Sequence, residues 1–187
     1  MLTQREILST LEMLKNENLD VRTVTLGVNL LDCASHDLEK LKNKIHTRVS
    51  HFARNLVSAC DQIGQKYGIP VVNKRIAVSP IAVVGASMSS SQLVDVAHVL
   101  DAVAAQVDVD FIGGFTALVE KGIARGDRAL IEAIPHALAN TERVCASVNV
   151  ASTKAGINMD AILLMGKAIK KAANLTAKSD GIACAKL

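Results

Sequence analysis

Four apolar runs rich in β-branched residues are separated along the chain by segments with the apolar spacing of α-helices. The runs span residues 21–31, 71–84, 109–112 and 143–150. Parallel strands need crossovers long enough to hold a helix, so strands that alternate with helices are typical of a parallel sheet. The sequence therefore predicts a single α/β domain over residues 1–187. Pro80 interrupts the second run, and we expect an edge, a bulge or a break there because proline has no N–H to donate.

The helical segments have start and stop signals of their own. Thr3 and Glu6 form the capping-box pattern that opens a first helix, which is expected to end near residue 18. One long helix is predicted from residue 35 until Gly68 and Pro70 end it. Further helices are predicted over residues 91–106, 116–125, 127–140 and 158–174.

Aliphatic and small polar side chains alternate along the first and last runs. The aliphatic positions include Val24, Leu26, Val28, Val144, Ala146 and Val148, and the positions between them include Thr25, Gly27, Asn29, Cys145, Ser147 and Asn149. Strand side chains point to opposite faces in turn, so each strand offers one face to helices and a polar face that needs hydrogen-bond partners. A barrel lumen that holds a ligand would explain the polar face.

Arg75 is the charged residue that says most about such a lumen. Its guanidinium stays charged, so inside a lumen it must be paired or must bind an anion. Asn73 shares its predicted face and is expected to orient a ligand, whereas a register shifted by one residue would put Lys74 there instead. Five side chains are predicted to converge on one cavity: Asn29, Arg75, Cys145, Ser147 and Asn149.

Gly113 and Gly114 are predicted to lie in a turn between the third strand and the next helix. Glycines there let backbone N–H groups approach a ligand, and a helix N-terminus favours anions. The alternative is a tight turn that uses glycine for its positive φ, since the spacing of dinucleotide-binding and Walker motifs is absent. Asp110, just before them, is either a site carboxylate or a turn residue.

A polar loop after the last strand is the second candidate anion site. Thr153 and Lys154 precede the predicted helix at Asn158, and hydroxyls with a lysine beside a helix N-terminus suit a carboxylate or a phosphate. The alternative is a capped loop in which Thr153 or Asn158 is the N-cap and Lys154 is solvated.

Cysteine and histidine placement gives little sign of metal or redox chemistry. Cys33 and Cys145 lie at or near strand ends, and Cys145 is a candidate nucleophile, although a free cysteine is more often a small buried hydrophobe. The four cysteines form no C-x-x-C pair, so neither a zinc ribbon nor a redox dithiol is indicated. The five histidines fall on predicted helices without metal-ligand spacing, and neither a metal nor a cofactor is assigned.

Composition excludes several classes of function. The net charge of +3 is spread along a chain with only four aromatic residues, and nucleic-acid binding is disfavoured without a basic stripe or stacking aromatics. No stretch approaches the roughly 20 apolar residues that span a bilayer, so neither membrane insertion nor secretion is predicted. A cytoplasmic location with reduced thiols is expected.

Four motifs resemble those of a bacterial and archaeal family, the domain of unknown function seven-eleven. They are V-V-N-K-R at 71–75, D-F-I-G-G-F at 110–115, S-V-N at 147–149 and T-K-A-G-I-N-M at 153–159. The resemblance covers the whole chain and implies half of a ten-stranded α/β barrel similar to those of pyruvate formate-lyase and anaerobic ribonucleotide reductase. Members are more than twice as long, so the chain is expected to be the N-terminal part of a larger barrel protein. No glycyl-radical motif is present, so the fold alone does not imply radical chemistry.

Two functions from different classes fit these features. The first is an enzyme that acts on a small carboxylate or phosphate metabolite, with Arg75 and Lys154 binding the anion, Asn73 and Asn149 orienting it and Cys145 as nucleophile. The second is a ligand sensor or regulatory scaffold, because the resemblance implies an ACT-domain protein, a module that binds amino acids, as partner. Open sheet edges also predict association with a second copy, as in a dimer, or with the rest of the polypeptide.

Overall fold

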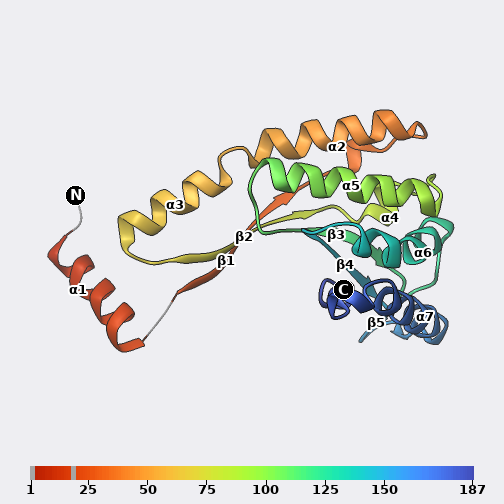
Figure 1. The fold of residues 1–187 in the computed structure, drawn as a ribbon. Helices are drawn as coiled ribbons and strands as arrows, with labels where there is room; N and C mark the ends of the chain where they lie inside the picture. Colours follow the sequence, from red (N-terminus) through yellow and green to blue (C-terminus); the bar gives the residue numbers. More distant parts are fainter. Residues whose placement is uncertain (1–2, 18–19) are drawn as a thin grey trace.

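A computed structural model of the chain describes residues 3–17 and 20–187, apart from the side chains of Leu14 and Glu17. Its main sheet has four parallel strands in the spatial order β1-β2-β3-β4 (Figure 1). The strands are β1 (Val21–Val28), β2 (Val71–Val78), β3 (Phe111–Leu118) and β4 (Val144–Asn149). The predicted α/β architecture with a parallel sheet is confirmed.

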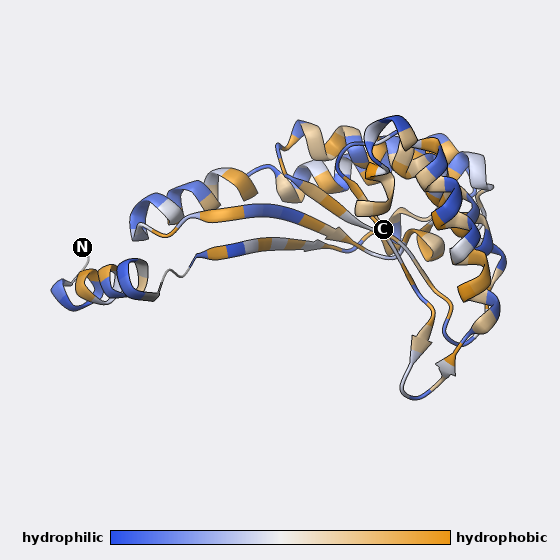
Figure 2. Ribbon diagram, turned by 60° about the horizontal axis from the view of Figure 1, so that its bottom comes forward, coloured by the Kyte–Doolittle hydropathy of each residue, from blue (hydrophilic) through white to orange (hydrophobic). Residues whose placement is uncertain are grey.

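The helices that follow the strands along the chain form one layer on one face of the sheet. They are α2 (Leu38–Ala53), α3 (Leu56–Tyr67), α4 (Ile81–Val84), α5 (Ser90–Gln106), α6 (Arg125–Ala139) and α7 (Met159–Leu175). Within the layer α2 contacts α5, α5 contacts α6 and α6 contacts α7. Figure 2 shows this layer above the sheet and, among the described residues, no helix against the opposite face.

The N-terminal helix stands apart from this layer. α1 (Gln4–Glu12) begins with the predicted capping box, in which Thr3 and Glu6 bond to each other's backbone and side chain. It continues as a π-helical segment, Met13–Glu17, and its predicted end near residue 18 lies outside the described residues. Figure 1 shows α1 projecting away from the body of the chain.

The aliphatic positions of the strands form the core beneath the helices. Val28, Ile76, Ile112 and Val144 are buried, one from each strand, and Phe115 is fully buried beside them. These side chains share one face because parallel partners in the register point the same way. The alternation predicted from the sequence is therefore the division between core and polar face.

The opposite side of the sheet, called here the open face, carries the small and polar positions. Its strand residues are Thr23, Thr25, Gly27, Asn73, Arg75, Ala77, Phe111, Gly113, Thr116, Leu118, Cys145, Ser147 and Asn149. All of them are exposed or half-buried. Asn29 and Ser79 follow directly after β1 and β2 and join the two strand ends through a hydrogen bond.

Two predicted helices are wrong. The single helix predicted from residue 35 is divided into α2 and α3 by a turn at Arg54 and Asn55, which the sequence marks with neither glycine nor proline. Residues 116–125 form the end of β3 and a turn, because Phe115, Ala117 and Val119 are buried at every second position and not at helical spacing.

The predicted interruption at Pro80 is confirmed as a break. β2 ends at Val78, and Pro80 becomes the N-cap of α4, with its carbonyl accepting hydrogen bonds from the N–H groups of Val83 and Val84. Proline is well suited to this position because a helix start needs no N–H from it.

Short elements complete the chain after β4. β5 (Ala151–Ser152) and β6 (Gly156–Ile157) form an antiparallel hairpin, which Figure 2 shows projecting away from the helical layer. After α7 come a 3₁₀ turn (Ala177–Ser179) and α8 (Ile182–Ala185). The carbonyl of Lys186 then accepts a hydrogen bond from the N–H of Ala146 on β4. No helix within the described ranges has the length and apolar character needed to cross a membrane.

Candidate functional site

The open face brings together most of the side chains that the sequence singles out. Arg75 pairs with Phe111, and in the next row Ala77 pairs with Gly113, which pairs with Cys145. Ser147 and Asn149 follow Cys145 on the same face of β4. Lys74 points to the helical side, where its Nζ lies 3.2 Å from Oδ1 of Asp61 on α3. Of the two cations that the sequence allows on the polar face, Arg75 or Lys74, the structure therefore places Arg75 there.

Arg75 is held against an aromatic ring rather than against a carboxylate. Its Cζ lies 5.2 Å from the centroid of the Phe111 ring, the geometry of a cation–π contact. Within the described part of the chain no ion pair or side-chain hydrogen bond is made by its guanidinium. Its N–H groups are therefore available to an anion.

Cys145 is half-buried on the same face. Burial raises the pKa of its thiol above the ordinary value, while the positive charges of Arg75 and Lys186 lower it in part. The neutral thiol is therefore the resting form at neutral pH. A role as nucleophile requires a base, and the strands of the open face carry no histidine.

Lys186 is a cation that sequence reasoning missed. It is buried, and its Nζ donates hydrogen bonds to the carbonyls of Leu138 and Thr141. Burial lowers its pKa from the ordinary value, with the negative charge of Asp101 acting in the opposite direction. The signal was weak, since a lysine directly after a short helix at residues 182–185 resembles any solvated surface lysine.

Hydrogen bonds link the strands at their carboxyl ends, the edge where open parallel sheets bind ligands. Oδ1 of Asn29 accepts hydrogen bonds from the Ser79 hydroxyl at 3.1 Å and from the N–H of Leu31 at 2.9 Å. The hydroxyls of Thr116 and Ser147 lie 2.8 Å apart. These contacts align small polar groups along the open face near the carboxyl ends of the strands.

Asn149 connects the open face to a neighbouring cavity. Its Nδ2 donates to Oε2 of Glu120 at 3.3 Å, and Glu120 lines a cavity of about 640 Å³ between the β3–α6 turn and the start of α7. Asn158 and the oppositely charged Arg128 and Asp160 also line it. Sequence reasoning missed Glu120, Arg128 and Asp160, because the helix predicted over 116–125 hid the strand end that places Glu120 here.

Gly113 and Gly114 do not form the predicted turn before a helix. They lie inside β3, where the register shifts between Gly113 and Phe115 to form a β-bulge. Gly114 has φ +119°, and a Cβ there would lie 2.4 Å from Cγ2 of Val78. Gly114 is therefore needed for backbone shape, and the predicted helix N-terminus beside these glycines is absent.

Asp110 and Asn73 bond to backbone groups of neighbouring strands. Oδ2 of Asp110 accepts from the N–H of Lys74 at 2.6 Å, which fixes the amino end of β3 beside β2. Nδ2 of Asn73 donates to the carbonyl of Arg22 at 3.1 Å. Both side chains thus have structural partners, and their roles toward a ligand stay predictions.

The loop after β4 leads into a helix that is capped by the side chain of a loop residue, as in the capped-loop alternative. Asn158 is the N-cap of α7: its Oδ1 accepts from the N–H of Ala161 and its Nδ2 donates to the carbonyl of Val119. Thr153 and Lys154 lie in the exposed turn of the β5–β6 hairpin. Lys154 is thus on a different element from Arg75, and whether both bind one anion stays a prediction.

The cysteines and histidines give no metal centre in residues 3–17 and 20–187, where no three potential ligands gather. All four cysteines are free thiols, and Cys33 is buried beneath α2.

Comparisons with known proteins place the chain among longer relatives. A UPF0210 protein of Syntrophobacter fumaroxidans is 68% identical over 187 residues, and one of Oleidesulfovibrio alaskensis is 59% identical over the same length. Each alignment covers 100% of this chain and 41% of the relative, so the chain spans about two fifths of the length of the curated relatives it matches. Residues 12–187 match the family model described as Uncharacterised ACR (DUF711). The chain therefore belongs to the DUF711 family, whose curated members here are UPF0210 proteins.

Proposed function

We propose that the open face binds a small carboxylate or phosphate metabolite, and that the longer protein acts on it as an enzyme. The observation that carries this proposal is the position of Arg75, a cation without an ionic partner in the described residues, on a polar sheet face beside Cys145. The contact with the Phe111 ring places the guanidinium beside that ring and leaves its N–H groups for a bidentate bond to an anion.

The remaining parts of the site lie on β4, closer to the carboxyl ends of the strands than Arg75 is. Ser147 and Asn149 offer a hydroxyl and an amide toward the carboxyl end of the sheet, and Glu120 lies beside Asn149. In the longer relatives we propose that this face lines the lumen of a barrel similar to that of pyruvate formate-lyase. Asn29, Gly113 and Asn149 would then border the bound metabolite, with Lys154 reaching it from the hairpin.

A ligand sensor is the second candidate, favoured by one observation. Burial raises the pKa of Cys145, and no histidine on the strands is placed to remove its proton, so the face suits binding better than thiol catalysis. An ACT-domain protein is then the proposed partner, and the bound metabolite would control that contact.

Calorimetric titration with inorganic phosphate and with malonate tests the binding. Arg75→Gln should weaken the affinity about tenfold or more, as expected for a lost charge-assisted hydrogen bond. Arg22→Gln is the matched control, because Arg22 lies on the same sheet but points to the opposite face. Equal affinities of the two variants would reject Arg75 as the anion site. Turnover of a bound metabolite by a full-length relative separates the enzyme from the sensor.

A further inference from the structure

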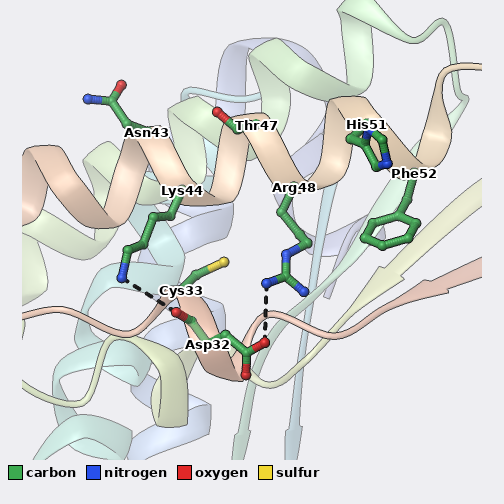
Figure 3. Close-up of a pocket in the computed structure, with 8 residues that line it drawn as sticks. All are labelled: Asp32, Cys33, Asn43, Lys44, Thr47, Arg48, His51 and Phe52. Atoms are coloured by element: carbon green, nitrogen blue, oxygen red, sulfur yellow. Dashed lines mark hydrogen bonds and ion pairs between the residues drawn. The ribbon is translucent and has the colours of Figure 1, made fainter.

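A second cleft lies at the outer edge of the sheet, on the side covered by helices. It has a volume of about 550 Å³ and opens where α2 passes over the 3₁₀ turn η2 (Leu31–Cys33) that follows β1. Figure 3 shows the side chains that line it: Asp32, Cys33, Asn43, Lys44, Thr47, Arg48, His51 and Phe52. The cleft therefore shares no residue with the open face.

Positive charge exceeds negative charge among these side chains. Lys44 and Arg48 lie one helical turn apart and extend from the same side of α2 toward η2 (Figure 3). Nζ of Lys44 lies 3.5 Å from the carbonyl oxygen of Asp32, and NH2 of Arg48 lies 3.2 Å from its Oδ2. Asp32 is the single carboxylate in the lining, so the two cations are not neutralised there.

The ion pair between Arg48 and Asp32 can exchange for a ligand. Their side chains are 33% and 73% exposed, and exposed pairs of this kind contribute at most about 1 kcal/mol. An anion that accepts hydrogen bonds from both Lys44 and Arg48 would be bound more strongly than the Asp32 carboxylate is, since bidentate charge-assisted hydrogen bonds are stronger than a single exposed ion pair. The bond from Lys44 to the Asp32 carbonyl is long, and it too is easily replaced.

An aromatic wall lies beside the cations. Phe52 is one turn beyond Arg48 on the same side of α2 (Figure 3), and 56% of its surface is exposed. The ring of His51 meets it edge to face, with centroids 5.2 Å apart and planes at 83°. A planar ring could stack on the free face of Phe52, and the apolar area removed from water would favour it.

We propose that this cleft binds a small anion that carries a planar ring, with Lys44 and Arg48 holding the anionic group and Phe52 covering the ring. The buried side chain of Cys33 closes the inner end. The volume lies within the usual range for small-molecule sites, about 300–1,000 Å³. A phosphate or a carboxylate on the ring fits equally, because both accept two hydrogen bonds from neighbouring cations.

A single-tryptophan reporter tests the proposal. The chain has no tryptophan, so Phe52→Trp places one indole in the cleft at an exposed position that tolerates it. The probes are AMP, benzoate, inorganic phosphate and adenosine. AMP or benzoate should change the tryptophan fluorescence saturably, at least tenfold more tightly than phosphate or adenosine, and the more tightly bound of the two identifies the anionic group. Calorimetry on Arg75→Gln, which removes the anion site proposed on the open face, should rank the probes in the same order.

Variants in the same background locate the binding. Lys44→Gln and Arg48→Gln should each weaken AMP or benzoate binding about tenfold, the effect of losing one charge-assisted hydrogen bond. Lys42→Gln, on another side of α2 where Lys42 pairs with Glu39, should leave it unchanged. Arg75→Gln should also leave AMP or benzoate binding to the cleft unchanged. The proposal for the cleft can therefore be tested separately from the proposal for the open face. Equal affinity for phosphate and AMP, no saturable binding of either ring-bearing anion, or equal loss in Lys42→Gln would overturn the proposal.

Discussion

Arg75 on β2 and Phe111 on β3 are direct partners in the sheet, and Cζ of Arg75 lies over the Phe111 ring, 5.2 Å from its centroid. The ring attracts the guanidinium of a flexible side chain without using its hydrogen-bond donors. Phe111 is thus a positioning residue for any anion that Arg75 binds.

Phe111→Leu should weaken phosphate or malonate binding by about two- to fivefold, since an exposed cation–π contact contributes roughly 0.5–1 kcal/mol. The loss should be smaller than that of Arg75→Gln because the charge remains. Calorimetry measures both, and Tyr67→Leu removes a comparable contact with Lys66 at a distant site as a control. An affinity unchanged by Phe111→Leu would show that the ring does not orient the guanidinium.

Two glycines of the sheet should differ sharply in their tolerance of alanine. Gly114→Ala should lower the free energy of unfolding by roughly 2–4 kcal/mol, because its φ is +119° and a Cβ would lie 2.4 Å from Cγ2 of Val78. Gly27→Ala should be nearly neutral, since nothing lies within 4 Å of a Cβ there. Urea unfolding of both variants checks this, and similar losses would contradict the bulge at Gly114.

The β-bulge also shows where prediction from sequence reached its limit. The glycine pair predicts a turn because two glycines after an apolar run usually end a strand. The buried alternation of Phe115, Ala117 and Val119 was present in the sequence, but it begins only after the bulge has shifted the register by one residue. The predicted helix over 116–125 followed from that error, and it hid Glu120 at the strand end.

The open face could be predicted because it depends on a strict period of two. Thr25, Gly27, Cys145 and Ser147 alternate with aliphatic residues without interruption, so their common face follows from strand geometry alone. The division between α2 and α3 left no comparable mark, because apolar spacing continues through Arg54 and Asn55. Lys186 and the cleft beneath α2 depend on contacts between distant segments, which no local pattern encodes.

Asp101 anchors the start of β4 and should be important for stability. Its carboxylate accepts hydrogen bonds from the N–H groups of Glu142 at 3.0 Å and Arg143 at 2.7 Å. Asp101→Ala should lower the free energy of unfolding by roughly 2–3 kcal/mol, because two backbone donors lose a charged acceptor. Asp95→Ala, at an exposed position of the same helix, is the control. Equal losses in denaturant unfolding would mean that the anchor contributes little.

The reactivity of Cys145 should depend on pH with a midpoint above the ordinary thiol value of 9.0, because burial favours the neutral form. The rate of alkylation by iodoacetamide, followed at this residue by peptide mass spectrometry, should rise through that midpoint. Arg75→Gln should move the midpoint higher, since the guanidinium charge lowers the pKa of the thiol. A midpoint below 9.0, or one that falls in the variant, would contradict this environment.

The isolated chain should associate, because one edge of its sheet has no partner strand among residues 3–17 and 20–187. On the β4 edge, the N–H of Ala146 donates a hydrogen bond to the carbonyl of Lys186. On the other edge, β1 pairs only with β2 among the described strands, so its outer side presents unpaired backbone groups. Light scattering over a concentration series should show a rising average mass that persists at high salt, because backbone pairing is not screened as ion pairs are. A monomer at high concentration that unfolds cooperatively would refute the expectation.

The spatial order of the four strands is also their order in the chain. Each strand therefore pairs with the strand that precedes it in the chain. The pairing of these four strands requires no strand from a more distant part of the sequence. Sequence separations between paired strands stay near the length of one crossover, which lowers the contact order and favours rapid formation. During synthesis, β1 and β2 can pair before β3 leaves the ribosome, so the sheet can grow from its N-terminal edge as the chain is made.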